Sequence, residues 1–298
     1  MSDRRGLFLI VLAAVLWGTT GTAQALGPAD ADPIAVGVVR LSVAAPALML
    51  VARMGRGTLE SPRSTWKPIV LAGLAMAAYQ PLFFLAVAET GVALGTVVTI
   101  GSAPLMTGLI ARLFDNEIPS RGWWPATALG IAGVALIGLS AKDVGTNPGG
   151  ILLALGAGLS FAVYIVTSRR VVVEMNPISG TAQVFVTAAV LSLPLLLWAD
   201  SSWIATQHGL VMAAHLGLVA TALAYVLFSL GAQVTRSPSA ATASLAEPLT
   251  ATMLGVLLLG EQPGIVGWSG LFLIFAGLVT LGSAGRGHAG REWSRLSA

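Results

Sequence analysis

Ten stretches of about 20 mostly apolar residues follow one another along this chain, with short polar segments between them. Helices of this length and character span the hydrocarbon core of a bilayer. The first five expected spans are Gly6–Ala25, Pro33–Ala52, Lys67–Val87, Gly91–Leu113 and Gly122–Ser140. The second five are Gly150–Ser168, Ile178–Trp198, Gly209–Gly231, Pro238–Gly260 and Gly264–Ser283. The sequence therefore predicts an all-α integral membrane protein with ten transmembrane helices.

Composition excludes the reading of these stretches as the core of a soluble protein. Of the 298 residues, 55% are hydrophobic and only 10% are charged, whereas a soluble domain carries about 25% charged residues. A soluble enzyme, a nucleic-acid-binding domain and a disordered protein are all excluded by this balance. The chain has no cysteine and only three histidines, so disulfides, thiolate metal sites and an ordinary zinc cluster are not expected.

The basic residues indicate the orientation. If the N-terminus is cytoplasmic, 14 of the 16 Lys and Arg residues fall on the cytoplasmic side, Lys142 falls outside, and Arg40 lies within the second span. Positive charge gathers in the cytoplasmic loops of membrane proteins. We therefore expect a multi-pass protein of the bacterial inner membrane whose N- and C-termini are both cytoplasmic.

The chain also repeats itself, without a gap, at an offset of 144 residues. Aligned pairs include Pro33 with Pro177, Phe84 with Phe228, Pro104 with Pro248, Glu117 with Glu261 and Trp124 with Trp268. A run of matches at one period indicates internal duplication. Each copy holds five spans, an odd number, so the second copy enters the membrane from the opposite side, as in secondary transporters. The sequence predicts two inverted five-helix repeats, residues 1–144 and 145–284, around a central cavity, followed by a cytoplasmic tail, 285–298.

Several short motifs resemble a known family. They are Leu16-Trp17-Gly18, Val39-Arg40-Leu41-Ser42, Ala103-Pro104-Leu105, Asn116-Glu117 and the run from Ala243 through Glu247-Pro248 to Glu261. These motifs resemble the EamA family of the drug/metabolite transporter superfamily, and within it the chain is most similar to the YddG-type amino-acid exporters. The resemblance covers essentially the whole chain and implies ten helices, a central cavity and export of amino acids or other metabolites. One departure is Ala103, which stands where the second half has Glu247, so the halves cannot share one acid-dependent role.

Few ionisable residues lie at membrane depth, where a charge costs about 2.5–3.5 kcal/mol and must face a cavity or a partner. Arg40 lies in the second expected span and Glu247 in the middle of the ninth. For each residue a structural role and a coupling role stay open: Arg40 could snorkel outward or pair helices, and Glu247 could be a hydrogen-bond hub beside Pro248. His215, in the eighth span, is expected to be an ordinary packing residue rather than a proton relay.

Aromatic and hydroxyl side chains at depth predict a substrate cavity. Trp17 is the deep tryptophan of the chain, and all three tyrosines lie well inside spans, where a phenol hydroxyl needs a partner that lipid does not offer. The residues predicted to line the cavity are Trp17, Thr20, Gln24, Tyr79, Phe83, Phe161, Tyr164 and Tyr225. Ordinary packing between helices is the alternative for any one of them.

Three prolines are predicted to act as hinges: Pro81, Pro104 and Pro248. A proline inside a helix removes one backbone hydrogen bond and frees the carbonyl four residues earlier. The carbonyls concerned are those of Ala77, Ile100 and Ser244. Pro104 and Pro248 are mates in the repeat, so we expect the two helices to break and bend together.

Together these features predict a secondary transporter that exports small amphiphilic metabolites, aromatic or neutral amino acids first, by alternating access. A multidrug or lipophilic-cation exporter, with Glu247 meeting the cation, is the alternative. A membrane-embedded enzyme or a scaffold is the alternative of another class, but the chain shows neither a nucleophile–base set nor a Walker loop. The expected partners are a small-molecule substrate and the lipid bilayer, with no nucleic acid and no cofactor. The sequence leaves the oligomeric state open.

Overall fold

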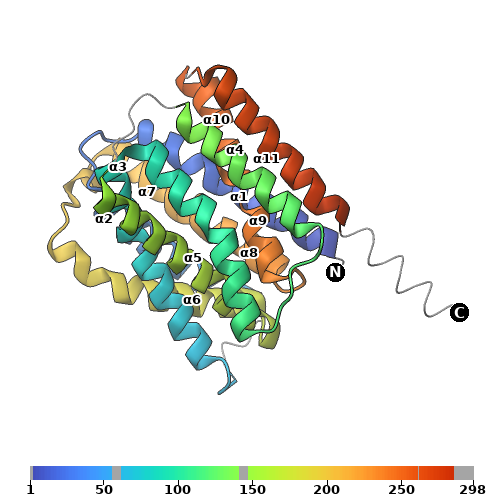
Figure 1. The fold of residues 1–298 in the computed structure, drawn as a ribbon. Helices are drawn as coiled ribbons and strands as arrows, with labels where there is room; N and C mark the ends of the chain where they lie inside the picture. The colour runs from blue at the N-terminus through green and yellow to red at the C-terminus, as the bar shows by residue number, and fades with distance from the viewer. Residues whose placement is uncertain (1–2, 56–61, 141–146, 261, 285–298) are drawn as a thin grey trace, which may run out of the picture.

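Apolar helices account for most of residues 3–55, 62–140, 147–260 and 262–284, the part of the chain that the computed structural model describes, and no strand is present there (Figure 1). The helices from the first half are α1 (Asp3–Ala25), α2 (Pro33–Met54), α3 (Trp66–Phe114) and α4 (Trp123–Leu139). Those from the second half are α5 (Pro148–Glu174), α6 (Pro177–Ser192), η1 (Leu193–Leu197), η2 (Ser202–Ala205), α7 (Gln207–Ala214), η3 (His215–Leu223), α8 (Ala224–Ala232), α9 (Ser237–Ala243), α10 (Ala246–Leu259) and α11 (Gly264–Ala284). Nine segments of this described part are long and apolar enough to cross a membrane, and α4 adds a tenth, shorter apolar helix. The prediction of ten helices is confirmed.

The long helix α3 contains two membrane spans, Trp66–Thr90 and Leu94–Phe114. The chain reverses direction between them, as the blue-to-green course of the ribbon shows (Figure 1). A Cβ added to Gly95 would lie 3.1 Å from the Cα of Val87, although eight residues of straight helix would place them about 12 Å apart. The third and fourth predicted spans are therefore joined by a very tight turn.

Mates in the repeat begin their helices in the same way. Asp32 precedes Pro33 at the start of α2, and its carboxylate accepts hydrogen bonds from the backbone N–H groups of Ile34 and Ala35. Asn176, 144 residues later, precedes Pro177 and caps α6 in the same manner. A polar N-cap followed by proline is a strong helix start.

Mates in the repeat also end their helices alike. Asn116 follows α3 with φ = 53°, and its mate Gly260 follows α10 with φ = 71°. The N–H groups of Asp115 and Glu117 both donate to the carbonyl of Ala111, at 3.0 and 3.1 Å, so the chain folds back over the last turn of α3. Asn116 is the non-glycine residue with positive φ among the described residues, and asparagine tolerates this left-handed conformation better than most residues do.

The three prolines predicted to break their helices do not lie at helix breaks. α3 runs through Pro81 and Pro104 as a helix. The ninth span breaks at Ser244 and Leu245, between α9 and α10, and Pro248 lies in the first turn of α10. The carbonyl of Ser244 is not free, because it accepts the N–H of Glu247 at 2.9 Å. The prediction that Pro248 frees this carbonyl is wrong: proline in a first helical turn removes no bond that the helix would otherwise make.

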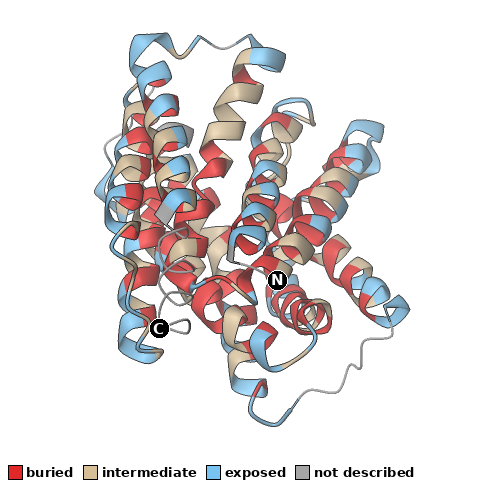
Figure 2. Cartoon of the chain, turned by 90° about the vertical axis from the view of Figure 1, so that its right-hand side faces the viewer, coloured by how far each residue is buried: buried red, intermediate tan, exposed pale blue. Residues whose placement is uncertain are grey.

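Buried positions lie along the middle of the bundle, and exposed positions lie on its outer faces and at its ends (Figure 2). α4 of the first half and α11 of the second half lie side by side (Figure 1). A Cβ added to Gly133 would lie 2.5 Å from the carbonyl oxygen of Gly270, and one added to Gly270 would lie 2.6 Å from the oxygen of Gly133. The two backbones therefore touch, a contact that only small residues permit.

Candidate functional site

Aromatic rings from five helices form one cluster in the middle of the bundle. The rings of Trp17 and Tyr225 lie 4.8 Å apart between centroids, and those of Trp17 and Phe161 lie 6.0 Å apart. Tyr79 lies 5.5 Å from Phe161 and 5.8 Å from Phe83. We call this set, with its neighbours, the aromatic cluster: Trp17, Tyr79, Phe83, Phe161, Tyr164, Phe185, Tyr225 and Phe228. All six aromatic residues predicted to line the cavity belong to it, so the structure brings them together.

The cluster has a buried side and a side that is partly exposed. Trp17, Tyr164 and Tyr225 are at most 4% exposed, whereas Tyr79 and Phe161 are partly exposed. Within the described part of the chain, the hydroxyl of Tyr225 donates only to the sulfur of Met76, at 3.9 Å. The indole N–H of Trp17 is buried and has no partner among the described residues. An unpaired buried donor costs about 1–3 kcal/mol, so this N–H keeps an unmet capacity to donate a hydrogen bond.

The polar residues predicted on α1 continue from the aromatic cluster. Thr20 and Gln24 are partly exposed on the face of α1 that carries Trp17. The side-chain amide of Gln24 donates a long hydrogen bond of 3.5 Å to the carbonyl of Thr20. Gly21 lies on this face too, and a Cβ added there would meet no atom within 4 Å. This face of α1 therefore borders open space and presents amide and hydroxyl groups to it.

Arg40 is fixed against an unusual stretch of helix. Its side chain is 8% exposed, and its Nε donates to the hydroxyl of Thr221 at 3.0 Å while Nη2 donates to the carbonyl of Ala220 at 3.3 Å. Both acceptors belong to η3, which is π-helical, and the Thr221 hydroxyl donates in turn to the Leu216 carbonyl. π-Helical segments are rare and occur often at functional sites. Arg40 thus pairs α2 with η3, as one of its predicted structural roles required, and does not snorkel outward.

Glu247 lies in the first turn of α10 and is partly exposed. α1 packs directly against it, because a Cβ added to Gly18 would lie 2.8 Å from the Glu247 carbonyl oxygen. No hydrogen bond or ion pair to the Glu247 carboxylate is present in the described part of the chain, although Arg40, Tyr79 and Tyr225 lie within electrostatic range of it. The start of a helix favours a negative charge. Arg40 and Glu247 therefore lie near the same region without forming a direct ion pair with each other.

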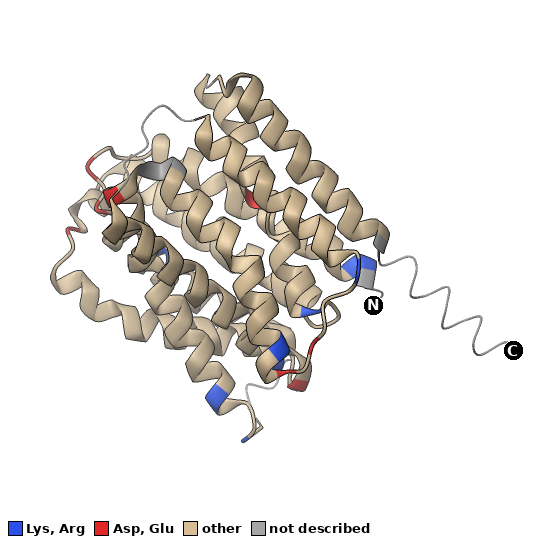
Figure 3. Ribbon diagram, in the orientation of Figure 1, with Lys and Arg blue, Asp and Glu red and all other residues tan. Residues whose placement is uncertain are grey.

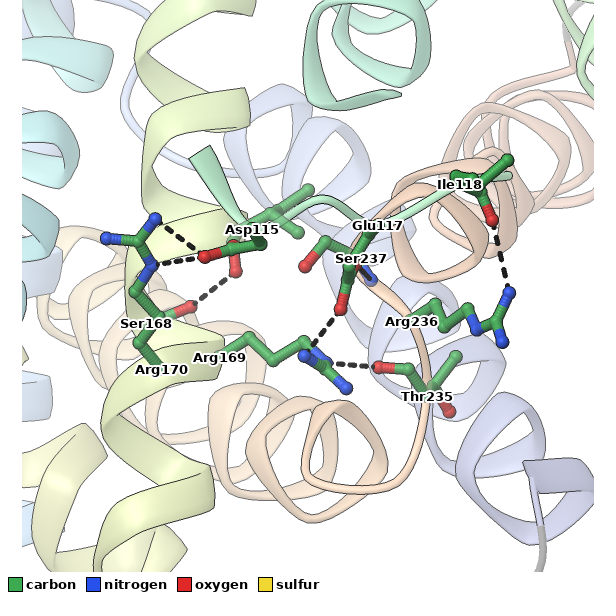
Figure 4. Close-up of polar contacts among 10 residues, drawn as sticks. Asp115, Glu117, Ile118, Ser168, Arg169, Arg170, Thr235, Arg236 and Ser237 are labelled. Carbon is green, nitrogen blue, oxygen red and sulfur yellow. Dashed lines mark hydrogen bonds and ion pairs between the residues drawn. The ribbon is translucent and has the colours of Figure 1, made fainter. Parts of the chain in front are cut away.

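Most of the described Lys and Arg residues gather at one end of the bundle, which we call the arginine end (Figure 3). Here the segment that follows α3 meets the end of α5 (Figure 4). Arg169 forms an ion pair with Glu117 at 2.6 Å, and Arg170 forms one with Asp115 at 2.6 Å. These bonds join a loop of the first half to the first helix of the second half.

The same network reaches the loop between α8 and α9 (Figure 4). The Nε of Arg169 donates to the Thr235 carbonyl at 2.7 Å, and Arg236 donates to the Ile118 carbonyl at 3.1 Å. The backbone N–H of Ser237 donates to the second oxygen of Glu117 at 3.0 Å. Sequence reasoning missed this network, although acidic residues after the fourth span and arginines after the sixth were expected on the same membrane side.

At the opposite end, a cavity of about 630 Å³ opens between α1, α7 and α10. Its lining includes Thr22, Leu26, Met212 and Leu258. His215 lies at its wall and shares a hydrogen bond of 2.9 Å with Thr19. The residues of α1 that line this cavity are neighbours of the predicted ones, and they lie on a different face of the helix from Trp17. His215 thus has an interhelical partner, as an ordinary packing residue would.

Comparison with known proteins agrees with this architecture. The model of the EamA-like transporter family matches the chain twice, over residues 4–139 and 148–283. The uncharacterized transporter YwfM of Bacillus subtilis (strain 168) is 41% identical over 97% of both chains. The threonine/homoserine exporter RhtA of Escherichia coli (strain K12) is 29% identical over 86% of this chain and 83% of its own. A solved crystal structure at 21% identity superimposes with a TM-score of 0.81 over 94% of this chain and 97% of its own, which shows the same fold.

These matches cover both halves of the chain, and the structure has the ten helices that the motifs in the sequence implied. The relatives are membrane transporters, and one is called an inner membrane transporter. The protein is therefore a multi-pass membrane transporter that belongs to the EamA-like transporter family.

Proposed function

We propose that this transporter exports small zwitterionic metabolites, with neutral and aromatic amino acids as the first candidates. The RhtA relative is named a threonine/homoserine exporter, and the motifs of the chain resemble those of YddG-type amino-acid exporters. Both likenesses favour a substrate that carries an ammonium group and a carboxylate. The residues around the aromatic cluster support the same class of zwitterionic substrate.

The observation that carries this proposal is the placement of Arg40 and Glu247 beside the aromatic cluster. A zwitterion held between them would direct its carboxylate toward the guanidinium of Arg40 and its ammonium group toward Glu247. The buried indole N–H of Trp17 adds a donor that has no partner among the described residues. The rings of Tyr79 and Phe161 offer apolar surface to the substrate side chain. A polyanion would meet only one fixed positive charge here, so it fits less well.

Of the two roles that the sequence left open for Glu247, the structure favours a part in binding or coupling. A structural hub would accept hydrogen bonds from neighbouring helices, because a buried carboxylate without partners is costly. The described residues donate none to the Glu247 carboxylate, which keeps some exposed surface. Its acceptor capacity is therefore available to a substrate ammonium group or to a proton.

Transport in this proposal follows alternating access, with residues 1–144 and 145–284 as the two moving halves. The structure then represents a state that is closed at the arginine end, where Glu117 and Asp115 of one half bind Arg169 and Arg170 of the other. With the termini in the cytoplasm, the closed end faces the cytoplasm. The network must break to admit substrate and must form again before release to the outside.

The test is counterflow in proteoliposomes that contain the purified protein and radiolabelled threonine, with unlabelled homoserine, phenylalanine and a lipophilic cation as competitors. We expect saturable exchange that amino acids compete for. Glu247→Gln should raise the KM about 10-fold or more, because an ammonium–carboxylate contact is replaced by a neutral one. Asp30→Asn, at an exposed loop carboxylate, is the matched control and should leave the KM unchanged.

The same experiment distinguishes export of amino acids from export of lipophilic cations. Competition by the cation alone, with no effect of any amino acid, would replace our proposal with that alternative. The absence of any saturable exchange, by protein that elutes as a single folded species, would contradict both readings.

A further inference from the structure

A second cavity, of about 390 Å³, lies at the arginine end on the outer surface of the bundle. It is formed by the first turns of α1, the end of α9 and the last turns of α11, and its lining is Arg4, Leu7, Phe8, Val11, Ala243, Leu278, Val279, Leu281 and Gly282. Phe8 is 62% exposed and Val279 is 53% exposed, so the cavity opens sideways, where the surrounding medium is the membrane. A Cβ added to Gly282 would meet no atom within 4 Å. Its volume falls within the range of about 300–1,000 Å³ that ligand sites occupy.

This cavity is not part of the central region. Phe8 and Trp17 are nine residues apart, which is about two and a half turns of helix, so they lie on opposite faces of α1. Between them, α1 packs closely on α8, because a Cβ added to Gly231 would lie 2.7 Å from a side-chain carbon of Ile10. A substrate held at the aromatic cluster would therefore not reach this cavity along α1.

The chemistry of the cavity is that of an amphiphile site. Its wall is apolar except at the end of the bundle, where Arg4 lies. Arg4 and the adjacent Arg5 are exposed, and within the described residues neither forms an ion pair. Arginines at the membrane surface beside a transmembrane helix attract anionic lipid headgroups, at about 1 kcal/mol for each residue.

We propose that this cavity binds one anionic phospholipid of the adjacent leaflet. Arg4, with Arg5 beside it, holds the phosphate group at the membrane surface. One acyl chain lies in the groove along Leu7, Phe8 and Val11 of α1 and against Leu278 and Val279 of α11. The lipid thus fills the space between the first helix and the last helix of the bundle, and the site is independent of the transported substrate.

The experiment compares retained lipid in the purified full-length protein. Delipidated protein is incubated with phosphatidylglycerol or with phosphatidylcholine, and bound lipid is counted by native mass spectrometry. We expect one tightly retained phosphatidylglycerol and weaker retention of phosphatidylcholine. Arg4→Ala should lower the affinity for phosphatidylglycerol about 5-fold, and Arg4→Lys should restore most of it. Arg53→Ala, which removes an exposed arginine at the same end but outside the cavity, is the matched control.

A second variant tests the groove without changing any charge. Gly282→Phe places a ring in the open space and should lower retention of both lipids, whereas Val190→Phe, on an exposed face elsewhere, should not. Equal affinity in Arg4→Ala and Arg53→Ala would overturn the role of Arg4. Unchanged retention in Gly282→Phe, in protein that elutes as a single folded species, would overturn the site itself. Neither result would bear on the proposed transport of amino acids, which is measured separately.

Discussion

The two ends of the bundle have similar backbones but different chemistry. Arg170 and Asp115 form an ion pair at the arginine end. Their mates at the opposite end, 144 residues away, are Leu26 and Leu259. Leu26 lines the cavity of about 630 Å³ instead of closing it. If transport follows the proposed alternating access, the two ends act as equivalent gates, and substitution at a few positions decides which of them is held shut. Here charge pairing favours closure at the arginine end.

The first prediction concerns which side each end faces, and its expected effect is all or none. Because the chain has no cysteine, single cysteines are easy to interpret. Gln207→Cys at the opposite end should react with a membrane-impermeant maleimide in intact cells. Ser64→Cys at the arginine end should react only after the cells are opened. The reverse pattern would place the arginine end outside the cell, and the closed end of the structure would then face the outside instead of the cytoplasm.

The second prediction breaks the network. Arg169→Ala leaves Glu117, whose side chain is 13% exposed, without its ion-pair partner, and removes the bond to the Thr235 carbonyl. We expect a loss of about 1–2 kcal/mol for the closed state, which shifts the equilibrium about 5–30-fold toward opening. Labelling of Ser64→Cys and of cysteines deeper along α3 should then rise in inverted vesicles. Arg170→Ala should have a smaller effect, because the side chain of Arg170 is 37% exposed and that of Arg169 only 25%.

A control for this prediction is Arg121→Ala, which removes an arginine at the same end that has no bond in the network. If it opens the arginine end as much as Arg169→Ala does, net charge rather than the specific ion pair holds this end closed.

The third prediction builds the missing pair at the opposite end. Leu26→Arg combined with Leu259→Asp copies the Arg170–Asp115 pair onto its mates. The double variant should slow counterflow a few-fold at low salt, and high salt should restore the rate, because an exposed pair is worth about 0–1 kcal/mol and is screened. The neutral pair of changes, Leu26→Gln with Leu259→Asn, should show no salt dependence. A slow rate that salt does not change would point to disturbed packing.

The smallest effect is expected at Asp200, an exposed residue at the opposite end. The backbone N–H and the hydroxyl of Ser202 donate to its carboxylate and hold its pKa below the usual value of 3.8. A lowered pKa contributes stability above pH 3.8 that is lost as the pH falls through the folded-state value. Thermal unfolding of Asp200→Asn should therefore differ slightly from that of the parent at neutral pH and converge with it as the pH falls below the folded-state pKa of Asp200. A difference that grows in acid would contradict this sign.

The parts of this molecule that depend on local sequence were predictable, and those that depend on distant partners were not. Stretch length alone predicted the ten helices, and depth within the spans predicted that Trp17, Tyr79 and Tyr225 would belong to one cluster. The ion pairs of Arg169 and Arg170 could not be predicted, because their partners lie 52 and 55 residues away and the pattern within one span carries no information about a distant loop. The role of each predicted cavity residue in binding stays a prediction.

Other departures have local causes that periodicity does not reveal. η3 has the apolar pattern of an ordinary span, so its π-helical winding could not be read from the residues. The ninth span breaks at Ser244 and Leu245, and α10 begins at Ala246. Pro248 then lies in the first turn of α10, where a proline removes no helical hydrogen bond. Pro248 therefore correctly predicted that the ninth span is interrupted, but it lies at the start of the second helical segment and not at the interruption itself.

The touching backbones of Gly133 and Gly270 restrict how the halves can move. One glycine belongs to α4 of the first half and the other to α11 of the second, and no side chain lies between them to act as a flexible spacer. Sliding one helix along the other would bring a larger neighbouring side chain against the partner backbone, where it would clash. A rotation about the line of contact avoids this clash. In the proposed alternating access, the α4–α11 contact would then be the axis about which the two halves rotate, and the ion pairs at the arginine end would form and break as they turn.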